Sequence, residues 1–508
     1  MEKDFKIKLI GVTENPQLLS VIGVLRHFGE KSSAELMEEL SRLSVSRQLL
    51  SAVESLDCSD KKSLAKLMEA LCRLSANPQL LSTAGALGCF EEKSSAELME
   101  ELSCLSEEER EEKERAVLKN SFGRGHGSVG DQNSFVFSVE NLPRAATLQI
   151  CQPHYLAHLQ QSLRRSKASR GFHLPEAVRN SPYREETERI LYKTFELYKE
   201  MSKAGVPDED ARYILPLYTR THIQTLGNAR ELCHLWKMTH SPKTEVPSIV
   251  RAVIDEMIEE AKKTAPLLFE DFKFNYETLA WCPSAQLYAS SNEPLSEMIA
   301  TKGQKDKVSL IGFDDRRFLS EASIEKVIQE RNEAELSNLK HIHFDFLAPM
   351  SLACFHQAIR QRTWDHAIES IYRAADCDAD SRMIVPPKIE QSDFDPQFRE
   401  LHLEIWSLYR KLLKGGIARC EAIGIMPHSL KIYDWIHING WNALHSIGKR
   451  TCTEAQGEIM GIARQIAKYV KEKAPVLGKW SEPQCVIYGY CPENKDCGYY
   501  KKFKKNTD

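Results

Sequence analysis

The second half of this 508-residue chain repeats the plan of its first half, and this repetition constrains the fold more than any other sequence feature. The alternating apolar and polar run at 134–140 returns at 341–346, which predicts a strand in each half. The helical pattern that closes with Lys-Lys-Thr-Ala-Pro at 262–266 returns as Lys-Glu-Lys-Ala-Pro at 471–475. The offset between such pairs stays near about 210 residues, which chance matches would not maintain.

The repetition predicts how the chain is divided. We expect an α+β fold of two homologous halves, 1–295 and 296–508, each with an opening strand, near 5–12 and 307–312. Gly, Ser, Asn and Pro residues around 290–305 are typical of a linker.

A second, shorter repeat is inserted near the start of the chain. A unit of 31 residues occurs three times across about 14–106, and its first and third copies are nearly identical. Each unit holds two short helical patterns, and Ser32 or Ser33 is placed to cap the second helix of the first copy. These patterns predict stacked helix pairs, and the near-identity of the copies leaves an inert spacer and a partner-binding surface equally open. The charge run that follows, 107–115, predicts an exposed helix.

Composition excludes several classes of protein. The net charge is -4, which argues against a dedicated binder of nucleic acid or anionic membranes. The chain lacks an apolar run of the roughly 20 residues that would cross a bilayer, and its start lacks the apolar core of a signal peptide, so we expect a cytoplasmic protein.

The 14 cysteines are scattered singly, which suits reduced, buried thiols better than disulfides. Cys485, Cys491 and Cys497 invite a metal interpretation, but their spacing is unlike that of zinc motifs and a fourth ligand is not evident. We therefore favour buried thiols and predict no metal site.

An arginine-rich stretch offers the first functional signal. Between 357 and 373 the chain carries Gln357, Arg360, Arg362, Ser370 and Arg373, directly after an apolar run. The guanidinium group presents a rigid fork of donors that suits phosphate and planar polar rings, so the stretch indicates nucleotide recognition. The alternative is a solvated helix face with ion pairs four residues apart.

Motifs in the first half resemble those of the flavin-dependent thymidylate synthases. They are, in chain order, Gly125-His126-x-Ser128, Gln160-Gln161-Ser162-x-Arg164, Arg212-x-x-x-Pro216 and Asn228-Ala-Arg230. The second half contributes Gln357-x-x-Arg360-x-Arg362 and Arg450-x5-Gln456-x-Glu458-Ile. Members of the family are about half as long, form homotetramers and place their active sites between subunits. The resemblance covers nearly the whole chain apart from the two extra helix-pair repeats.

The two halves depart from the family pattern at complementary positions. The family's flavin-holding Arg-His-Arg triplet reads Gln152-Pro-His154 in the first half and Arg360-Gln361-Arg362 in the second. The family's arginine ahead of Leu-Pro is Arg212 in the first half, whereas the second half has Ile423 at that position. The family's arginine ahead of the Ala-Gln-x-Glu run is Arg450 in the second half, whereas the first half has Thr239. Asn228-Ala-Arg230 becomes Asn439-Gly-Trp441. The resemblance therefore implies a composite active site, to which each half brings the set that it retains.

The resemblance also implies a role for each residue. The predicted ligands of deoxyuridylate (dUMP) are Gln160, Gln161, Ser162, Arg164, Arg212, Gln357, Arg360 and Arg450. The predicted contacts of FAD are His126, Ser128, Asn228, Arg230, His234, Arg360, Gln361 and Arg362. Arg450 would also be catalytic, because it would face the pyrimidine and stabilise the charge that develops there. His126 is equally well interpreted as a core histidine.

The implied reaction is the methylation of dUMP to thymidylate, with methylenetetrahydrofolate as carbon donor and FAD, reduced by NADPH, as hydride donor. Two such chains would form a homodimer that rebuilds the family's four-unit assembly. The alternative from another class is a catalytically inactive flavin- or nucleotide-binding scaffold whose helical repeats recruit a partner; Trp441 and the altered triplet keep it open.

Overall fold

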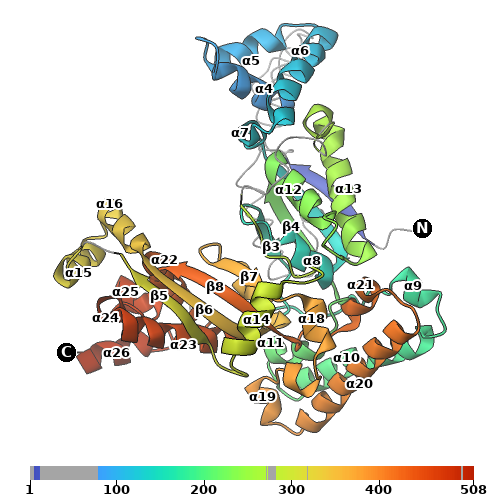
Figure 1. Cartoon of the computed structure of the whole chain (residues 1–508), viewed down its shortest axis with the longest axis vertical. Coiled ribbons are helices and arrows are strands. Elements are labelled where there is room, and N and C mark those ends of the chain that lie inside the picture. The colour runs from blue at the N-terminus through green and yellow to red at the C-terminus, as the bar shows by residue number, and fades with distance from the viewer. Residues whose placement is uncertain are drawn as a thin grey trace, which may run out of the picture. The chain divides into compact units, whose positions relative to one another are not determined.

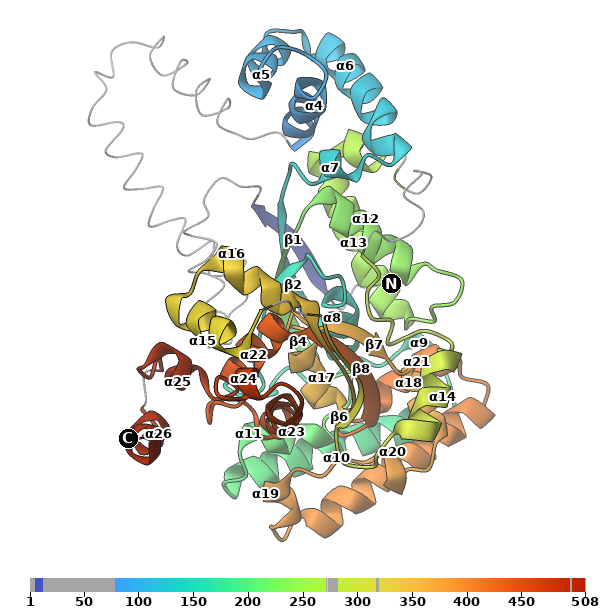
Figure 2. The same cartoon turned by 60° about the vertical axis from the view of Figure 1, so that its left-hand side comes forward.

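The computed structural model of the chain describes residues 5–11, 78–270, 272, 282–316, 319–493 and 496–507. These residues divide into two compact units. The first unit comprises residues up to 176 together with 218–283, and the second comprises 177–217 together with 284–508. Each unit is described by itself, and its elements can be followed in Figures 1 and 2.

Four strands and several helices form the first unit. Its strands are β1 (Lys6–Gly11), β2 (Phe135–Pro143), β3 (Ala157–Gln160) and β4 (Arg220–Gly227). Its helices are α4 (Pro78–Gly88), α5 (Ser95–Ser103), α6 (Glu107–Asn120), η1 (Phe122–Arg124), α7 (Gly127–Gly130), α8 (Arg144–Ile150), α12 (Ala229–Thr239), α13 (Ser248–Thr264) and η3 (Pro266–Phe269). The short helix α9 (Glu176–Arg179) begins at the boundary between the units.

The second unit has the same kind of sheet and more helices. Its strands are β5 (Ser309–Asp315), β6 (Ile342–Ser351), β7 (Asp365–Ile368) and β8 (Lys431–Asn439). Its helices before β7 are α10 (Arg184–Lys203), α11 (Asp208–Ala211), η2 (Arg212–Ile214), α14 (Glu293–Lys302), α15 (Glu321–Glu330), α16 (Glu333–Leu336), η5 (Ser337–His341) and α17 (Leu352–Ala358). Those after β7 are α18 (Ile371–Asp376), η6 (Asp380–Arg382), α19 (Pro387–Glu390), α20 (Asp395–Lys414), α21 (Arg419–Ala422), η7 (Ile423–Ile425), α22 (Gly440–Arg450), α23 (Gly457–Lys473), α24 (Pro475–Gly478), α25 (Gln484–Tyr488) and α26 (Tyr499–Thr507).

The two sheets share one topology. Their strand orders are β1-β2-β4-β3 and β5-β6-β8-β7, and all neighbours pair antiparallel. Each sheet is followed by a helix pair of matching lengths, 11 residues in α12 and α22 and 17 residues in α13 and α23. The predicted α+β fold with two homologous halves is therefore confirmed.

Amphipathic helices close the cores. Helix α13 packs on β1 and β2 and α23 packs on β6. The buried face of α13 carries Val250, Val253, Ile254 and Met257, which follow the three- and four-residue spacing of one helix face. Apolar side chains on one side of each helix thus cover one face of each sheet.

The compact units do not coincide with the two sequence halves, because segment 177–217 of the first half belongs to the second unit. Within that unit α10 packs against its counterpart α20, and both helices have 20 residues. The Glu404 carboxylate of α20 lies 3.1 Å from an Arg189 Nη2 and 2.9 Å from the Lys193 Nζ of α10. The first half thereby contributes residues to the unit that contains the second half.

The third copy of the 31-residue repeat is a helix pair, as predicted. Helices α4 and α5 share a small core of Ala84, Leu98 and Leu102. Ser94 caps α5, since its hydroxyl accepts a hydrogen bond from the Glu97 amide while the Glu97 carboxylate accepts one from the Ser94 amide. The earlier two copies, with Ser32 and Ser33, lie outside the described residues.

The predicted linker around 290–305 is wrong for most of its length, because residues 293–302 form helix α14. Leu295 is buried against Leu347 and Tyr433, and Met298 and Ile299 pack beside it. Three apolar residues at helical spacing thus outweigh the turn-forming residues around them. The exposed helix predicted at 107–115 is confirmed as the first part of α6, whose glutamates occupy its first turn.

Candidate functional site

The predicted phosphate segment of the first unit is a rigid loop at the end of β3. The Gln160 Nε2 donates a hydrogen bond to the Thr147 Oγ1 at 2.9 Å, and the Gln161 amide donates to the His222 carbonyl at 3.1 Å. Both glutamines are buried, whereas Ser162 and Arg164 are only half-buried. The glutamines therefore hold the loop in place, and the loop presents Ser162 and Arg164.

The predicted flavin contacts of the same unit gather around Asp131. Its carboxylate accepts hydrogen bonds from the Asn228 Nδ2 at 3.0 Å and from an Arg230 Nη1 at 3.1 Å. Asn228 also caps α12 by accepting a hydrogen bond from the Glu231 amide. A Cβ atom at Gly127 would lie 2.4 Å from the Arg230 Nε, so the guanidinium rests on the glycine backbone.

The other first-half predictions fall beside this group. His126 is the N-cap residue of α7, and Ser128 lies within that short helix. His234 is buried on α12, with its Nδ1 3.9 Å from the Glu231 carboxylate. The structure thus brings together Ser128, Asn228 and Arg230 through the ends of α7 and α12.

The second unit brings Arg212 of the first half beside residues of the second half. An Arg450 Nη2 donates a hydrogen bond to the Gln357 carbonyl at 3.2 Å. The Gln357 Nε2 donates a hydrogen bond to the Gln456 Oε1 at 3.5 Å, and Gln456 in turn bonds the hydroxyl of Tyr213, the residue after Arg212. These hydrogen bonds link Arg450 of the second half to the segment that carries Arg212, and together they define one neighbourhood. Burial raises the pKa of the Cys354 thiol, and the positive charges of Arg450 and Arg212 oppose that rise.

A buried hydrogen-bond network holds this neighbourhood. The Glu458 carboxylate accepts a hydrogen bond from the Tyr213 hydroxyl, one from the Ser351 amide at 2.7 Å and one from the Ser351 hydroxyl at 2.5 Å. The Gln456 Nε2 donates to the Tyr213 hydroxyl at 2.7 Å. Burial raises the pKa of Glu458, while these hydrogen bonds and the charge of Arg212 oppose the rise.

The counterpart residues cannot rebuild this network elsewhere in the chain. Equal-length elements align Tyr213 in η2 with Gly424 in η7, and Glu458 in α23 with Ile249 in α13. The N-cap residues Gln456 and Ser351 align with Pro247 and Pro143, neither of which makes a side-chain cap. The network therefore needs Tyr213 from one half and three partners from the other.

The arginine triplet follows α17 in the second unit. Arg360 is half-buried and Arg362 is exposed, while Gln361 is buried between them. The Gln361 Nε2 donates to the Thr363 Oγ1 at 2.8 Å and lies 3.4 Å from the His445 Nδ1. Gln361 therefore anchors the turn, and the two arginines remain accessible to a ligand.

The predicted site residues are thus divided between the two units. Gln160, Gln161, Ser162, Arg164, His126, Ser128, Asn228, Arg230 and His234 belong to the first, and Arg212, Gln357, Arg360, Gln361, Arg362 and Arg450 belong to the second.

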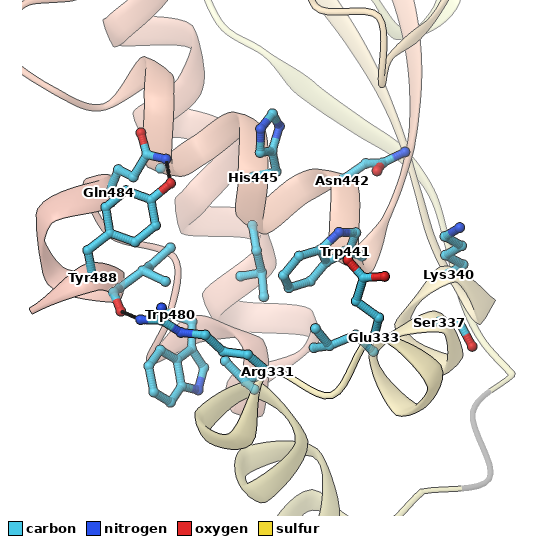
Figure 3. A pocket seen from close by; sticks show the side chains of 15 residues that line it. Arg331, Glu333, Ser337, Lys340, Trp441, Asn442, His445, Trp480, Gln484 and Tyr488 are labelled. Carbon is cyan, nitrogen blue, oxygen red and sulfur yellow. Dashed lines mark hydrogen bonds between the residues drawn. The ribbon is translucent and has the colours of Figure 1, made fainter. Parts of the chain in front are cut away.

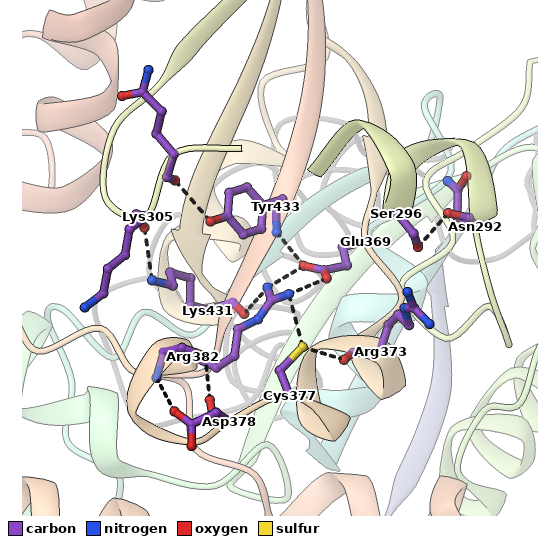
Figure 4. A network of polar contacts seen from close by, with 12 residues as sticks. Asn292, Ser296, Lys305, Glu369, Arg373, Cys377, Asp378, Arg382, Lys431 and Tyr433 are labelled. Carbon is purple, nitrogen blue, oxygen red and sulfur yellow. Dashed lines mark hydrogen bonds and ion pairs between the residues drawn. The ribbon is translucent and has the colours of Figure 1, made fainter. Parts of the chain in front are cut away.

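The second copy of the phosphate segment is closed by the protein itself (Figure 4). The buried Glu369 carboxylate accepts hydrogen bonds from two Arg382 nitrogens at 2.7 and 2.8 Å and one from the Tyr433 amide at 3.0 Å. The Ser370 hydroxyl donates to the Ala289 carbonyl at 2.6 Å. Ser370 is 1% exposed, so its hydroxyl is already engaged and is closed off from a ligand.

Sequence reasoning missed several of these residues. Tyr213 directly follows Arg212, and Ser351 directly precedes a helical pattern, which is the usual signal of an N-cap. The pairing of Glu369 with Arg382, 13 positions apart, had no local signal.

The buried-thiol prediction holds only in part for the three C-terminal cysteines. Cys485 is buried, but Cys491 is partly exposed and Cys497 is exposed. Among the residues that the structure describes, no group of three or more histidine, cysteine or acidic side chains is arranged to hold a metal ion. In the same described ranges, no helix is both long and apolar enough to cross a membrane.

Comparison with known proteins identifies the same duplication. The family model "Thymidylate synthase complementing protein" matches twice, at residues 70–267 and 277–476. The flavin-dependent thymidylate synthase of Geobacter sulfurreducens is 32% identical over 161 residues, which are 31% of this chain and 68% of that protein. The flavin-dependent thymidylate synthase of Sulfurisphaera tokodaii is 28% identical over 229 residues, 44% of this chain and 81% of that protein. A solved structure of the UMP/dUMP methylase PolB from Streptomyces cacaoi aligns with a TM-score of 0.32 and 19% identity, covering 39% of this chain and 91% of that one.

Proposed function

Because this chain belongs to the family of thymidylate synthase complementing proteins, the flavin-dependent thymidylate synthases, we propose that it methylates dUMP to thymidylate. The active site is composite: each half supplies the residues that the other has lost. The observation that supports this most strongly is the hydrogen-bonded link, through Gln456, between Gln357 and Tyr213, the residue after Arg212, inside one compact unit.

The nucleotide is held by residues of both halves. Ser162, Arg164 and Arg212 bind its phosphate by charge-assisted hydrogen bonds, which are stronger than neutral ones. Buried Gln160 and Gln161 hold the loop that carries Ser162 and Arg164, so little ordering of this loop is needed when the phosphate binds. The closed second loop around Glu369 explains why the complementary site is inactive.

Arg450 is the catalytic residue. Its guanidinium is held by the Gln357 carbonyl, and it lies at the end of α22 beside a buried network. A cation that is fixed before reaction stabilises negative charge on the pyrimidine without reorganising. The hydrogen bonds among Tyr213, Glu458 and Ser351 position the part of the site around Arg450, and these three residues do not contact the nucleotide.

The residues present fit a flavin dinucleotide. The pyrophosphate of FAD needs hydrogen-bond donors, and the accessible Arg360 and Arg362 supply cationic donors that are not buried in the core. Ser128, Asn228 and Arg230 form a polar group around Asp131 that can contact the sugar and ring. When bound, the flavin, reduced by NADPH, supplies the hydride, and methylenetetrahydrofolate supplies the carbon. His126 and His234 complete this side of the site, and Gln361 fixes the turn between the arginines.

Two chains form a homodimer that reproduces four family units. Each chain carries two such units, so a dimer contains the number that the resemblance leads us to expect. Sedimentation equilibrium of the purified protein should give twice the chain mass of 58.0 kDa.

Two experiments test the proposed function. The full-length protein should be yellow as purified and should convert dUMP to thymidylate only with methylenetetrahydrofolate and NADPH. It should also rescue growth of a thymidine auxotroph that lacks thymidylate synthase. A colourless protein that takes up no added FAD and fails to rescue growth would instead support the nucleotide-binding scaffold.

A further inference from the structure

A cavity lies in the second unit, at the side of α22 (Figure 3). Its volume is about 560 Å³, within the range of roughly 300–1,000 Å³ that is typical of small-molecule sites. Helices α15, α16, α22 and α25 and the turn after α24 contribute to its wall. The cavity is therefore large enough for a nucleotide.

Aromatic side chains dominate one side of the cavity. Trp441, Trp480 and Tyr488 line it, and Figure 3 shows all three around one opening. Their flat rings offer stacking surfaces to an aromatic ligand.

Charged side chains occupy the edge of the cavity. Arg331 lies with its guanidinium 6.0 Å from the centre of the Tyr488 ring, in the left-handed conformation that ends α15. Lys340 is exposed and supplies a second cation, against the single carboxylate of Glu333. Aromatic walls with a cationic edge suit a flat heterocycle that carries negative charge.

The cavity occupies the second half's counterpart of the flavin-contact region. Trp441 stands where the first half has Arg230, and Glu335 of α16, next to the cavity, stands where it has His126. The guanidinium that contacts Asp131 in the first unit is thus replaced by an indole, which offers a stacking surface instead. The chemistry of this region therefore differs between the two halves.

The cavity is joined to the proposed active site by α22, and Arg450 is not among the residues that line the cavity. Trp441, Leu444, His445 and Gly448 follow one face of this helix, whose last residue is Arg450. The Asn442 Nδ2 donates to the Thr363 carbonyl at 3.2 Å, just after the arginine triplet. The same helix therefore lines the cavity and carries Arg450.

We propose that this cavity binds the aromatic base of a phosphate-bearing nucleotide, separately from the substrate and flavin positions. The base stacks on Trp441, and the phosphates face Arg331 and Lys340. Two sources share this chemistry: a free purine nucleotide and the adenosine end of a pyridine nucleotide.

Calorimetric titration of the full-length protein with ADP and with NADPH tests the proposal. Trp441→Ala should weaken binding about 10-fold or more, because a stacked base is lost. Trp236→Phe, in α12 of the first unit, is the matched control and should bind as the wild type does. Binding of ADP alone would assign a free nucleotide, and tighter binding of NADPH would assign the pyridine nucleotide.

Several results would overturn the proposal. Binding of neither probe by the wild-type protein would do so, and so would unchanged affinity in both Trp441→Ala and Lys340→Ala. Lys340 is exposed, so its variant tests binding even where Trp441→Ala does not fold. Loss of half the bound flavin in Trp441→Ala would show a second flavin site instead. Arg450→Ala should retain ADP binding, which separates this site from the proposed enzymatic function.

Discussion

Removing the Tyr213 hydroxyl tests how segment 177–217 is held in the second unit. The hydroxyl donates to the buried Glu458 carboxylate and accepts from the Gln456 Nε2 at 2.7 Å. Tyr213→Phe removes both bonds and leaves two buried polar groups incompletely bonded. A hydrogen bond to a charged group is worth about 1.5–3 kcal/mol, and an unsatisfied buried group costs about 1–3 kcal/mol. We therefore expect the free energy of unfolding of this unit to fall by about 2–4 kcal/mol.

Tyr409→Phe is the matched control for this measurement. Tyr409 is 1% exposed, and within the described residues its hydroxyl is buried without a hydrogen-bond partner. The same chemical change should therefore leave stability unchanged or raise it slightly. Urea unfolding of the full-length protein, followed by near-UV circular dichroism, compares the two variants with the wild type.

A double-mutant cycle isolates the bond itself. Tyr213→Phe and Glu458→Gln, alone and together, should show a coupling energy of about 1–3 kcal/mol, because the two residues share one network. Equal stability of Tyr213→Phe and Tyr409→Phe, or a coupling energy near zero, would refute the placement of this segment.

Three further experiments probe the rest of the structure. Arg382→Met leaves the buried Glu369 carboxylate unpaired and should cost about 3–5 kcal/mol in urea unfolding, whereas adding Glu369→Gln should restore much of the loss. Burial lowers the pKa of His402 to about 3 from an ordinary value of 6.5. Between these two pH values the histidine binds a proton in the unfolded chain but not in the folded one. The free energy of unfolding should therefore fall by about 1.4 kcal/mol per pH unit as the pH decreases below 6.5. His402→Gln should flatten this dependence between pH 7.5 and 5.5, and an unchanged slope would contradict the assignment. Ser94→Ala should destabilise the α4–α5 pair by about 1 kcal/mol without changing enzymatic activity; an equal stability of this pair in hydrogen exchange would refute the cap.

The sequence predicts the sheets and the duplication well because both depend on patterns of neighbouring residues. The alternating runs at 134–140 and 341–346 became the central strands β2 and β6, and the Lys-Ala-Pro patterns marked the ends of α13 and α23. Period-two and helical patterns reflect which face of an element is buried, so they survive divergence of the two copies.

Other features depend on contacts between distant residues and could not be predicted in this way. The placement of segment 177–217 with the second half follows from packing between α10 and α20, to which neither helix's own pattern points. The pairing of Glu369 with Arg382 closes the second phosphate segment. The sequence motif alone indicated only that this segment matches the family's phosphate motif less well than the first one does. The predicted roles of the site residues in both halves remain predictions.

The composite active site is tested most directly by the turnover of three single variants. Arg212→Ala in the first half and Arg450→Ala in the second should each reduce the conversion of dUMP to thymidylate about 100-fold or more, because each removes a fixed cation from the same site. Arg373→Ala is the control, since this exposed arginine lies beside the closed second phosphate segment, and it should retain nearly full activity. Full activity in Arg450→Ala, or equal losses in all three variants, would contradict a single site built from both halves.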